Sequence, residues 1–96
     1  MEFKTVTKNI TIKSKQGLHA RPAAFFVQVA NKFDSDISII KDGQEVNGKS
    51  IMGILMLAAE RGALVCLKAI GADAEAAVSE LEKVLIEDRD DYYEQK

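Results

Sequence analysis

The only histidine of the chain, His19, is the side chain best suited to nucleophilic chemistry. Pro22 follows closely and suits the first turn of a helix, where its missing N–H costs nothing. The N–H groups at a helix start are unpaired and carry a partial positive charge, which favours a neutral imidazole with a free lone pair. The N–H groups of Ala20 and Arg21 could then bind an anion attached to that nitrogen. This spacing predicts a nucleophile beside its own anion-binding backbone.

Two neighbours of His19 fit phosphate as that anion. The guanidinium of Arg21 is a planar cationic fork that matches phosphate oxygens. Gly17 has no Cβ, so its backbone can approach an anion closely and its N–H is a third candidate donor. A lone histidine is more often a surface or capping residue, and a lone arginine is more often a solvated charge. Their spacing at a predicted helix start favours phosphate chemistry.

A second candidate site begins at Ser50, which precedes an apolar run that predicts a helix over 51–59. Serine is a common N-cap, so capping is its first predicted role. Residues 51–58 contain seven apolar side chains around Gly53. A half-buried helix needs about three apolar residues in two turns. Some of these side chains must therefore face water, which predicts a docking surface.

Composition excludes several other functions. A net charge of -2 gives no electrostatic footprint for nucleic acid. One histidine and one cysteine, Cys66, are too few for a metal site or an internal disulfide. The sequence has no Walker-type glycine loop, so no cofactor is expected. No apolar run of 18 residues and no secretory leader occur, which predicts a cytoplasmic protein without membrane insertion.

Hydrophobic periodicity divides the chain into seven elements within one domain, residues 1–96. A polar acidic tail over 87–96 is expected to fray. Period-two patterns predict strands over 5–13, 36–41, 44–47 and 64–70. Helical patterns predict helices from Ala20 for three to four turns, over 51–59, and after Asp73, the last with the apolar stripe Ala77, Val78, Leu81, Val84 and Leu85.

Short polar and glycine-containing segments separate these elements. Residues 14–17 break the first strand, and Asp42-Gly43 is a strong hairpin signal because both residues tolerate positive φ. Gly62 is expected to stop the second helix, and Asp73 is expected to cap the third.

The order strand, helix, strand, strand, helix, strand, helix predicts an α+β fold. One four-stranded antiparallel sheet with three helices packed on one face, an open-faced β-sandwich, satisfies that order. Strand 64–70 is apolar on both faces. We expect Val65, Leu67 and Ala69 to point inward, and Leu64, Cys66 and Ile70 to point outward.

Two motifs of this chain resemble those of one known family. Gly17-Leu18-His19-Ala20-Arg21-Pro22-Ala23 resembles the active-site motif of the HPr family, the histidine-containing phosphocarriers of bacterial phosphotransferase systems. Lys49-Ser50-Ile51-Met52-Gly53 resembles the family's regulatory serine motif. The resemblance extends over nearly the whole chain, to about Ile86, because the order of elements, the hairpin and the later glycines match as well.

The resemblance implies roles for individual residues. The histidine that matches His19 accepts a phosphoryl group through Nδ1 from enzyme I, which is charged by phosphoenolpyruvate, and passes it to an enzyme IIA. The arginine that matches Arg21 helps to hold the phosphate. The serine that matches Ser50 is modified in many relatives by an ATP-dependent HPr kinase/phosphorylase. The residues that would meet enzyme I and enzyme IIA are Ala20, Ala24, Ile51, Met52 and Leu55.

The resemblance leaves three alternatives open. The run 54–58 suits the nitrogen-related branch of the family, whereas the motif around Ser50 points to the sugar branch. A purely regulatory HPr-like protein is a second alternative. Some relatives of that kind lack the histidine, and the presence of His19 counts against this alternative. A small enzyme such as an acylphosphatase would need an arginine-containing phosphate loop, which is absent. The expected protein is a monomeric phosphoryl-transfer intermediary rather than a turnover enzyme, for an unspecified sugar or pathway.

Overall fold

The chain folds as seven elements in the predicted order. The computed structural model describes residues 3–13 and 17–87. Its elements are β1 (Lys4–Thr11), α1 (Ala20–Ala30), β2 (Asp36–Lys41), β3 (Gln44–Asn47), α2 (Ile51–Met56), β4 (Leu64–Gly71) and α3 (Ala74–Ile86).

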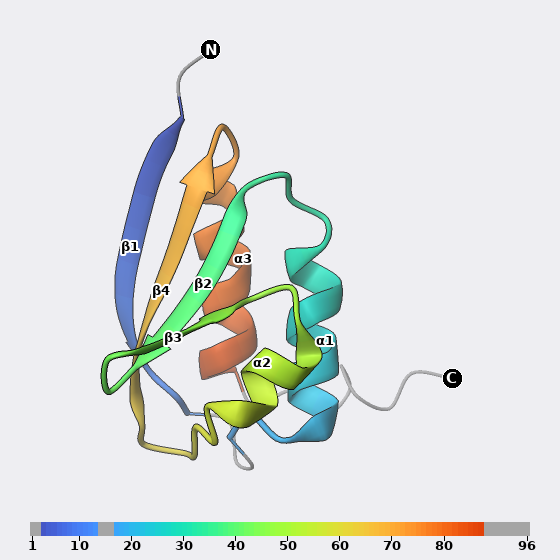
Figure 1. Cartoon of the computed structure of the whole chain (residues 1–96), viewed down its shortest axis with the longest axis vertical. Coiled ribbons are helices and arrows are strands. Elements are labelled where there is room, and N and C mark those ends of the chain that lie inside the picture. The colour runs from blue at the N-terminus through green and yellow to red at the C-terminus, as the bar shows by residue number, and fades with distance from the viewer. Residues whose placement is uncertain (1–2, 14–16, 88–96) are drawn as a thin grey trace.

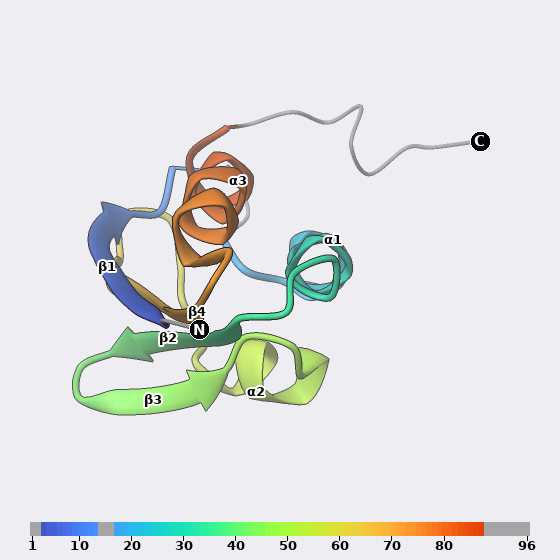
Figure 2. The same cartoon turned by 90° about the horizontal axis from the view of Figure 1, so that it is seen from above.

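The four strands form one antiparallel sheet in the order β1-β4-β2-β3 (Figure 1). Helices α1 and α3 cover one face of this sheet, and the short α2 lies beside α1 next to β3 (Figure 2). The predicted fold class, an open-faced α+β sandwich, is confirmed. The start of α1 lies at the same end of the molecule as the end of α3 (Figure 1).

Period-two burial along β4 places the core between sheet and helices. Val65, Leu67 and Ala69 are buried, whereas Leu64 is 62% and Ile70 is 38% exposed on the outer face. The predicted two faces of this strand are therefore confirmed, and no helix of the described residues covers the outer one. From α1 and α3 the core receives Ala23, Phe26, Val29, Ala30, Ala74, Ala77, Val78, Leu81, Val84 and Leu85.

The hairpin between β2 and β3 forms where the sequence predicts it. Asp42 has φ +52° and Gly43 has φ +82°. Positive φ at both central residues is the conformation of a type I′ turn, whose twist matches that of the paired strands.

The prediction that the second helix reaches residue 59 and stops at Gly62 is wrong. Helix α2 ends at Met56, and Ala58 adopts φ +51° with its N–H donating to Leu55 O at 3.1 Å. A left-handed residue just after a helix is a usual way to end it, although glycine is the usual choice. Gly62, at φ +92°, belongs to the turn that follows.

The predicted capping role of the Asp73 side chain is also wrong. Asp73 occupies the N-cap position of α3, but its carboxylate makes no cap hydrogen bond. It accepts hydrogen bonds from the N–H of Asp34 at 2.9 Å, the N–H of Ser35 at 3.0 Å, and the Ser35 hydroxyl. The Ser35 hydroxyl and then the Asp34 N–H lower the pKa of Asp73, since each stabilises the carboxylate. We call this junction between the α1–β2 loop and the start of α3 the Asp73 clamp.

Smaller differences concern the first strand and the termini. β1 ends at Thr11, but Ile12 is still buried, and its N–H donates to Ala63 O at 2.9 Å. Residues 14–16 of the expected break, and 88–96 of the expected tail, lie outside the described residues.

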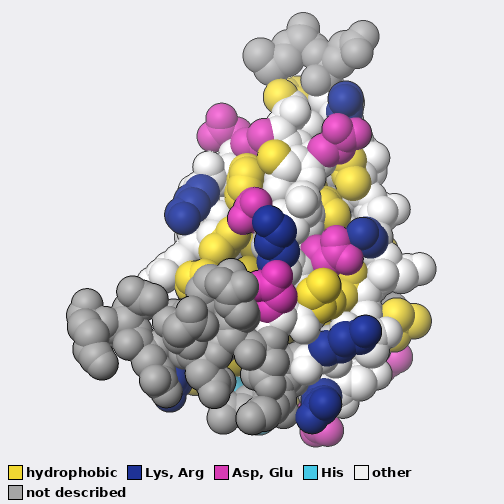
Figure 3. Space-filling view, turned by 180° about the vertical axis from the view of Figure 1, so that it is seen from behind, with side chains coloured by type: hydrophobic (Ala, Val, Ile, Leu, Met, Phe, Trp, Pro, Cys, Tyr) yellow, Lys and Arg dark blue, Asp and Glu magenta, His cyan; other side chains and the backbone are white. Residues whose placement is uncertain are grey.

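The face formed by α3 and β1 carries charges of both signs side by side (Figure 3). Three ion pairs join them: Lys4–Glu75 at 3.8 Å, Lys8–Glu82 at 2.8 Å and Lys83–Glu80 at 3.4 Å. A face whose charges are mixed has no strong field of one sign. In the described part of the chain, no helix is long and apolar enough to cross a membrane.

Candidate functional site

His19 lies at the start of α1, as its spacing from Pro22 predicts. It is the N-cap residue of α1, with extended backbone at φ −81° and ψ −171°, and its carbonyl accepts the Ala23 N–H at 2.8 Å. The His19 side chain makes no cap hydrogen bond, and the residue is exposed. Its backbone is therefore fixed by the helix while its ring is left to solvent.

The segment before His19 is fastened to the turn that follows α2. The Leu18 N–H donates to Ala59 O at 2.9 Å, and the Leu18 side chain is buried. Gly17 has φ +64°, and a Cβ there would lie 2.6 Å from Ala59 O and 2.8 Å from the Glu60 Cα. Glycine is thus required for close packing against residues 59–61. Anion binding by its N–H stays a prediction.

The first turn of α1 contains two of the residues whose N–H groups are predicted to bind an anion. Ala20 and Arg21 are the first two helical residues, and both are exposed. The Ala20 N–H has no acceptor within the helix, because the first N–H groups of an α-helix lack one. No acidic residue stands in this first turn. The helix start therefore places partial positive charge at His19, and no carboxylate of the same turn offsets it.

Ser50 caps α2, which confirms its first predicted role. The Gly53 N–H donates to Ser50 Oγ at 3.1 Å. The turn before it is held by Asn47, whose Oδ1 accepts the Lys49 N–H at 2.8 Å. The Lys49 ammonium donates to Phe33 O, beyond the end of α1, at 2.7 Å. These contacts join the Ser50 turn to the loop that follows α1.

The apolar side chains of α2 divide between core and solvent, as their number predicts. Ile54 and Leu57 are buried, whereas Ile51 is 39%, Met52 is 63% and Met56 is 66% exposed. Met56 was not among the predicted docking residues. Among the other predicted docking residues, Ala20 is exposed, and Ala24 and Leu55 are half-buried.

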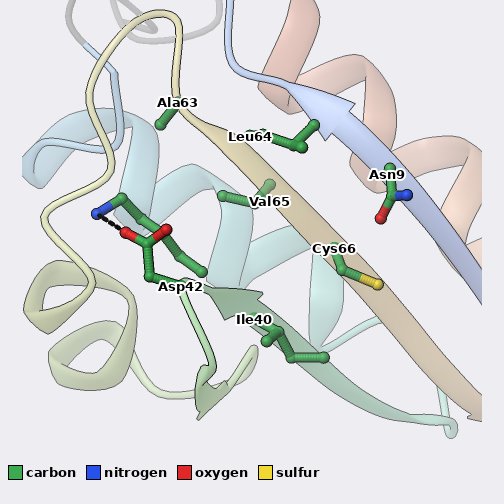
Figure 4. Close-up of a pocket in the computed structure, with 8 residues that line it drawn as sticks. Asn9, Ile40, Asp42, Ala63, Leu64, Val65 and Cys66 are labelled. Carbon is green, nitrogen blue, oxygen red and sulfur yellow. Dashed lines mark ion pairs between the residues drawn. The ribbon is translucent and has the colours of Figure 1, made fainter.

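A hollow on the outer face of the sheet does not belong to this site. It measures about 370 Å³ and lies between β1, β4 and the β2–β3 hairpin (Figure 4). Its walls include Asn9, Leu64 and Cys66, and a Lys41–Asp42 ion pair of 3.4 Å stands at one side. His19 does not line it. Within residues 3–13 and 17–87, no group of His, Cys, Asp and Glu side chains could hold a metal ion.

Glu60 and Arg61 are charged neighbours of the site that the sequence did not reveal. Both are exposed, and their backbone lies against Gly17. They are far from His19 in the sequence, and no periodic pattern connects the two segments. Ala58 has positive φ and turns the chain toward Gly17, but an alanine in the sequence does not indicate this conformation.

The chain is similar to known proteins in both sequence and fold. A family model described as the PTS HPr component phosphorylation site matches residues 6–87. The HPr-like protein Crh of Bacillus subtilis is 49% identical over 76 residues, which are 79% of this chain and 89% of that protein. A crystal structure of a phosphocarrier protein HPr from Bacillus anthracis has 48% identity and a TM-score of 0.82, and the match covers 84% of this chain and 96% of that one. A crystal structure of an HPr dimer from Thermoanaerobacter tengcongensis has 46% identity and a TM-score of 0.68, with 90% and 94% covered.

Proposed function

This chain belongs to the HPr family of the phosphotransferase system, and on that premise we propose that His19 accepts a phosphoryl group from phosphorylated enzyme I and donates it to an enzyme IIA. The family relation supports a phosphocarrier. One observation supports His19 as the carrier residue: its ring is exposed at the start of α1 and is not used to cap the helix.

In the proposed transfer, the Nδ1 lone pair of His19 attacks the phosphorus of the phosphoryl group carried by the donor. A P–N bond to His19 Nδ1 forms while the bond between phosphorus and the donor's residue breaks, and that residue leaves with the electron pair of the broken bond. The N–H groups of Gly17, Ala20 and Arg21, with the Arg21 guanidinium, stabilise the phosphoryl oxygens. Transfer to enzyme IIA is the same exchange in the other direction, so the chain is an intermediary without net turnover of a small molecule.

The proposal is tested by incubating the chain with phosphoenolpyruvate and catalytic enzyme I. We expect acid-labile, alkali-stable phosphate on the wild-type chain and none on His19→Ala. The label should move to enzyme IIA when that protein is added. Acid-labile phosphate on the His19→Ala variant would show that another residue carries the group.

We further propose that Ser50 is a regulatory phosphorylation site for an HPr kinase/phosphorylase. Its hydroxyl oxygen accepts the Gly53 N–H, so the hydroxyl proton can still be removed. A phosphate adds about −1.5 to −2 charge, and a helix start tolerates negative charge. We expect the modification to leave the fold unchanged and to repel acidic partners. Amide chemical shifts that change across the whole domain after modification would contradict this.

The proposed partner surface consists of Ala20, Ala24, Ile51, Met52 and Leu55. The exposure of Ile51 and Met52 beside the His19 helix supports it, and methionine adapts to differently shaped partners. We infer that the chain acts as one cytoplasmic domain, residues 1–96, and as a monomer. Sedimentation at several concentrations tests the last point, because one similar crystal structure is that of an HPr dimer.

A regulatory HPr-like protein is the second candidate function, and the similarity to Crh favours keeping it. The presence of His19 favours the carrier. Competence of the wild-type chain in transfer to enzyme IIA distinguishes them: a chain modified at Ser50 that never passes phosphate to enzyme IIA would be regulatory.

A further inference from the structure

The turn over residues 58–62 is built against the segment that carries His19. The Leu18 N–H donates to Ala59 O at 2.9 Å, and the Gly62 N–H donates to Ile12 O at 2.8 Å. Between these bonds, a Cβ at Gly17 would lie 3.1 Å from the Arg61 N. The backbone of Arg61 is therefore fixed next to the residue two before His19.

Arg61 is an exposed cation in this fixed turn. It has no ion pair or side-chain hydrogen bond within the described part of the chain. Five lysines elsewhere each have a carboxylate within 4 Å: Lys4, Lys8, Lys41, Lys68 and Lys83. Arg61 has no such partner, and neither have the exposed Lys13 and Lys32 among the described residues.

Phosphoryl transfer requires the donor protein to bring its own phosphorylated residue to the His19 ring. Its surface must then approach the segment that carries the ring, and the 58–62 turn packs against that segment at Gly17 and Leu18. A guanidinium that an interface covers must be paired, because an unpaired charge removed from water is costly. A carboxylate is the protein group that pairs with it in two parallel hydrogen bonds.

We propose that Arg61 is a docking residue for the phosphoryl donor and binds a carboxylate on the donor's surface. This inference rests on the proposed function and adds a contact outside the two helices. Arg61 promotes the association of the two proteins and does not contact the transferred phosphoryl group. Charge pairs of this kind raise association rates and specificity, and their effect weakens with salt.

Neighbouring Glu60 allows a test by sign. It is exposed in the same turn and carries the opposite charge. The variants Arg61→Gln and Glu60→Gln each remove one charge with a side chain of similar shape. A structural role of the turn would make both variants worse. An electrostatic role makes their effects opposite, because a carboxylate on the donor is repelled by Glu60.

The experiment measures initial rates of phosphoryl transfer from phosphorylated enzyme I over a range of carrier concentrations. We expect Arg61→Gln to raise KM about five- to tenfold with kcat unchanged, and to flatten its dependence on salt. Arg61→Lys should recover part of the loss, and Glu60→Gln should lower KM. Lys32→Gln, an exposed cation at the far end of α1, is the control and should leave KM unchanged.

An unchanged KM for Arg61→Gln, or an equal rise for Glu60→Gln, overturns the inference while leaving the proposed function intact. Absence of label on the wild-type chain overturns the proposed function and, with it, the inference. Melting temperatures close to that of the wild type for Arg61→Gln, Glu60→Gln and Lys32→Gln would show that these variants retain the fold.

Discussion

Gly17 determines how closely the segment before His19 approaches the rest of the protein. Its φ of +64° and its contact with Ala59 are both accessible to a residue without Cβ. The position of the His19 backbone therefore depends on the absence of a Cβ two residues earlier in the chain.

Replacement of Gly17 by alanine should destabilise the protein by about 1–3 kcal/mol, from left-handed strain and from the clash with Ala59 O. Phosphoryl transfer should also slow, because the segment must shift. Urea unfolding and the labelling assay measure the two effects. Gly43→Ala is the control that separates backbone strain from the steric clash: φ is +82° at residue 43, but nothing lies within 4 Å of the added Cβ. A loss of stability no larger than that of Gly43→Ala would contradict the importance of the contact.

The sequence predicted that His19 and Arg21 lie at one helix start, because their spacing from Pro22 has a local physical meaning. Their roles in phosphoryl transfer stay predictions. It missed Arg61, because proximity to Gly17 arises from the turn after α2 and from hydrogen bonds between distant segments. Local patterns can place residues on one element, but they do not specify which loops meet.

Among the secondary-structure elements, α2 departs most from its predicted length. The apolar run continues through Ala59, so periodicity gives no reason to stop at Met56. Packing decides instead: Leu57 and Ala59 are buried on either side of Ala58, which turns the chain at φ +51°. The strand bounds 36–41 and 44–47 were predicted correctly, since the Asp42-Gly43 turn fixes the register of the hairpin.

Replacement of Ala58 by glycine should stabilise the protein by about 0.5–1 kcal/mol. The left-handed backbone at residue 58 costs alanine about 1–2 kcal/mol, which glycine avoids. Glycine also increases the conformational entropy of the unfolded chain, which offsets part of this stabilisation. Ala76→Gly, at an exposed position of α3, should instead lose about 1 kcal/mol. Urea unfolding measures the stability of both variants. A loss of stability in Ala58→Gly as well as in Ala76→Gly would contradict strain at residue 58.

Replacement of Ser50 by alanine should cost about 1 kcal/mol, because the Gly53 N–H loses its acceptor. Ser50→Asp should lose much less, since aspartate also caps helices. Thermal unfolding of the two variants distinguishes capping from other roles of this residue. Equal losses in both variants would show that the cap contributes little.

At the scale of the whole molecule, the Asp73 clamp and the His19 site stand at opposite ends of the helical layer. The clamp joins the loop after α1 to the start of α3, so it holds together the two helices that cover the sheet. Sequence reasoning assigned Asp73 to its own helix. A carboxylate binds whichever backbone N–H groups the fold brings near, and here a distant loop supplied them.

The clamp should make stability depend on acid. The pKa of Asp73 is lower in the folded protein than in the unfolded chain, so its contribution is complete above the unfolded value of about 3.9. It is lost as pH falls through the folded pKa. Unfolding free energy measured from about pH 5 to about pH 2 should fall less steeply for Asp73→Asn than for the wild type. Equal slopes would contradict the clamp's contribution.

The uncovered outer face of the sheet also has a practical consequence. Cys66 is the only cysteine in the sequence, and it is half-buried on that face, in a hollow that His19 does not line. A thiol-reactive fluorophore would therefore attach at a single known position without mutagenesis. Its emission would report the binding of other proteins in real time, and a nitroxide spin label there would give distances to labelled partners.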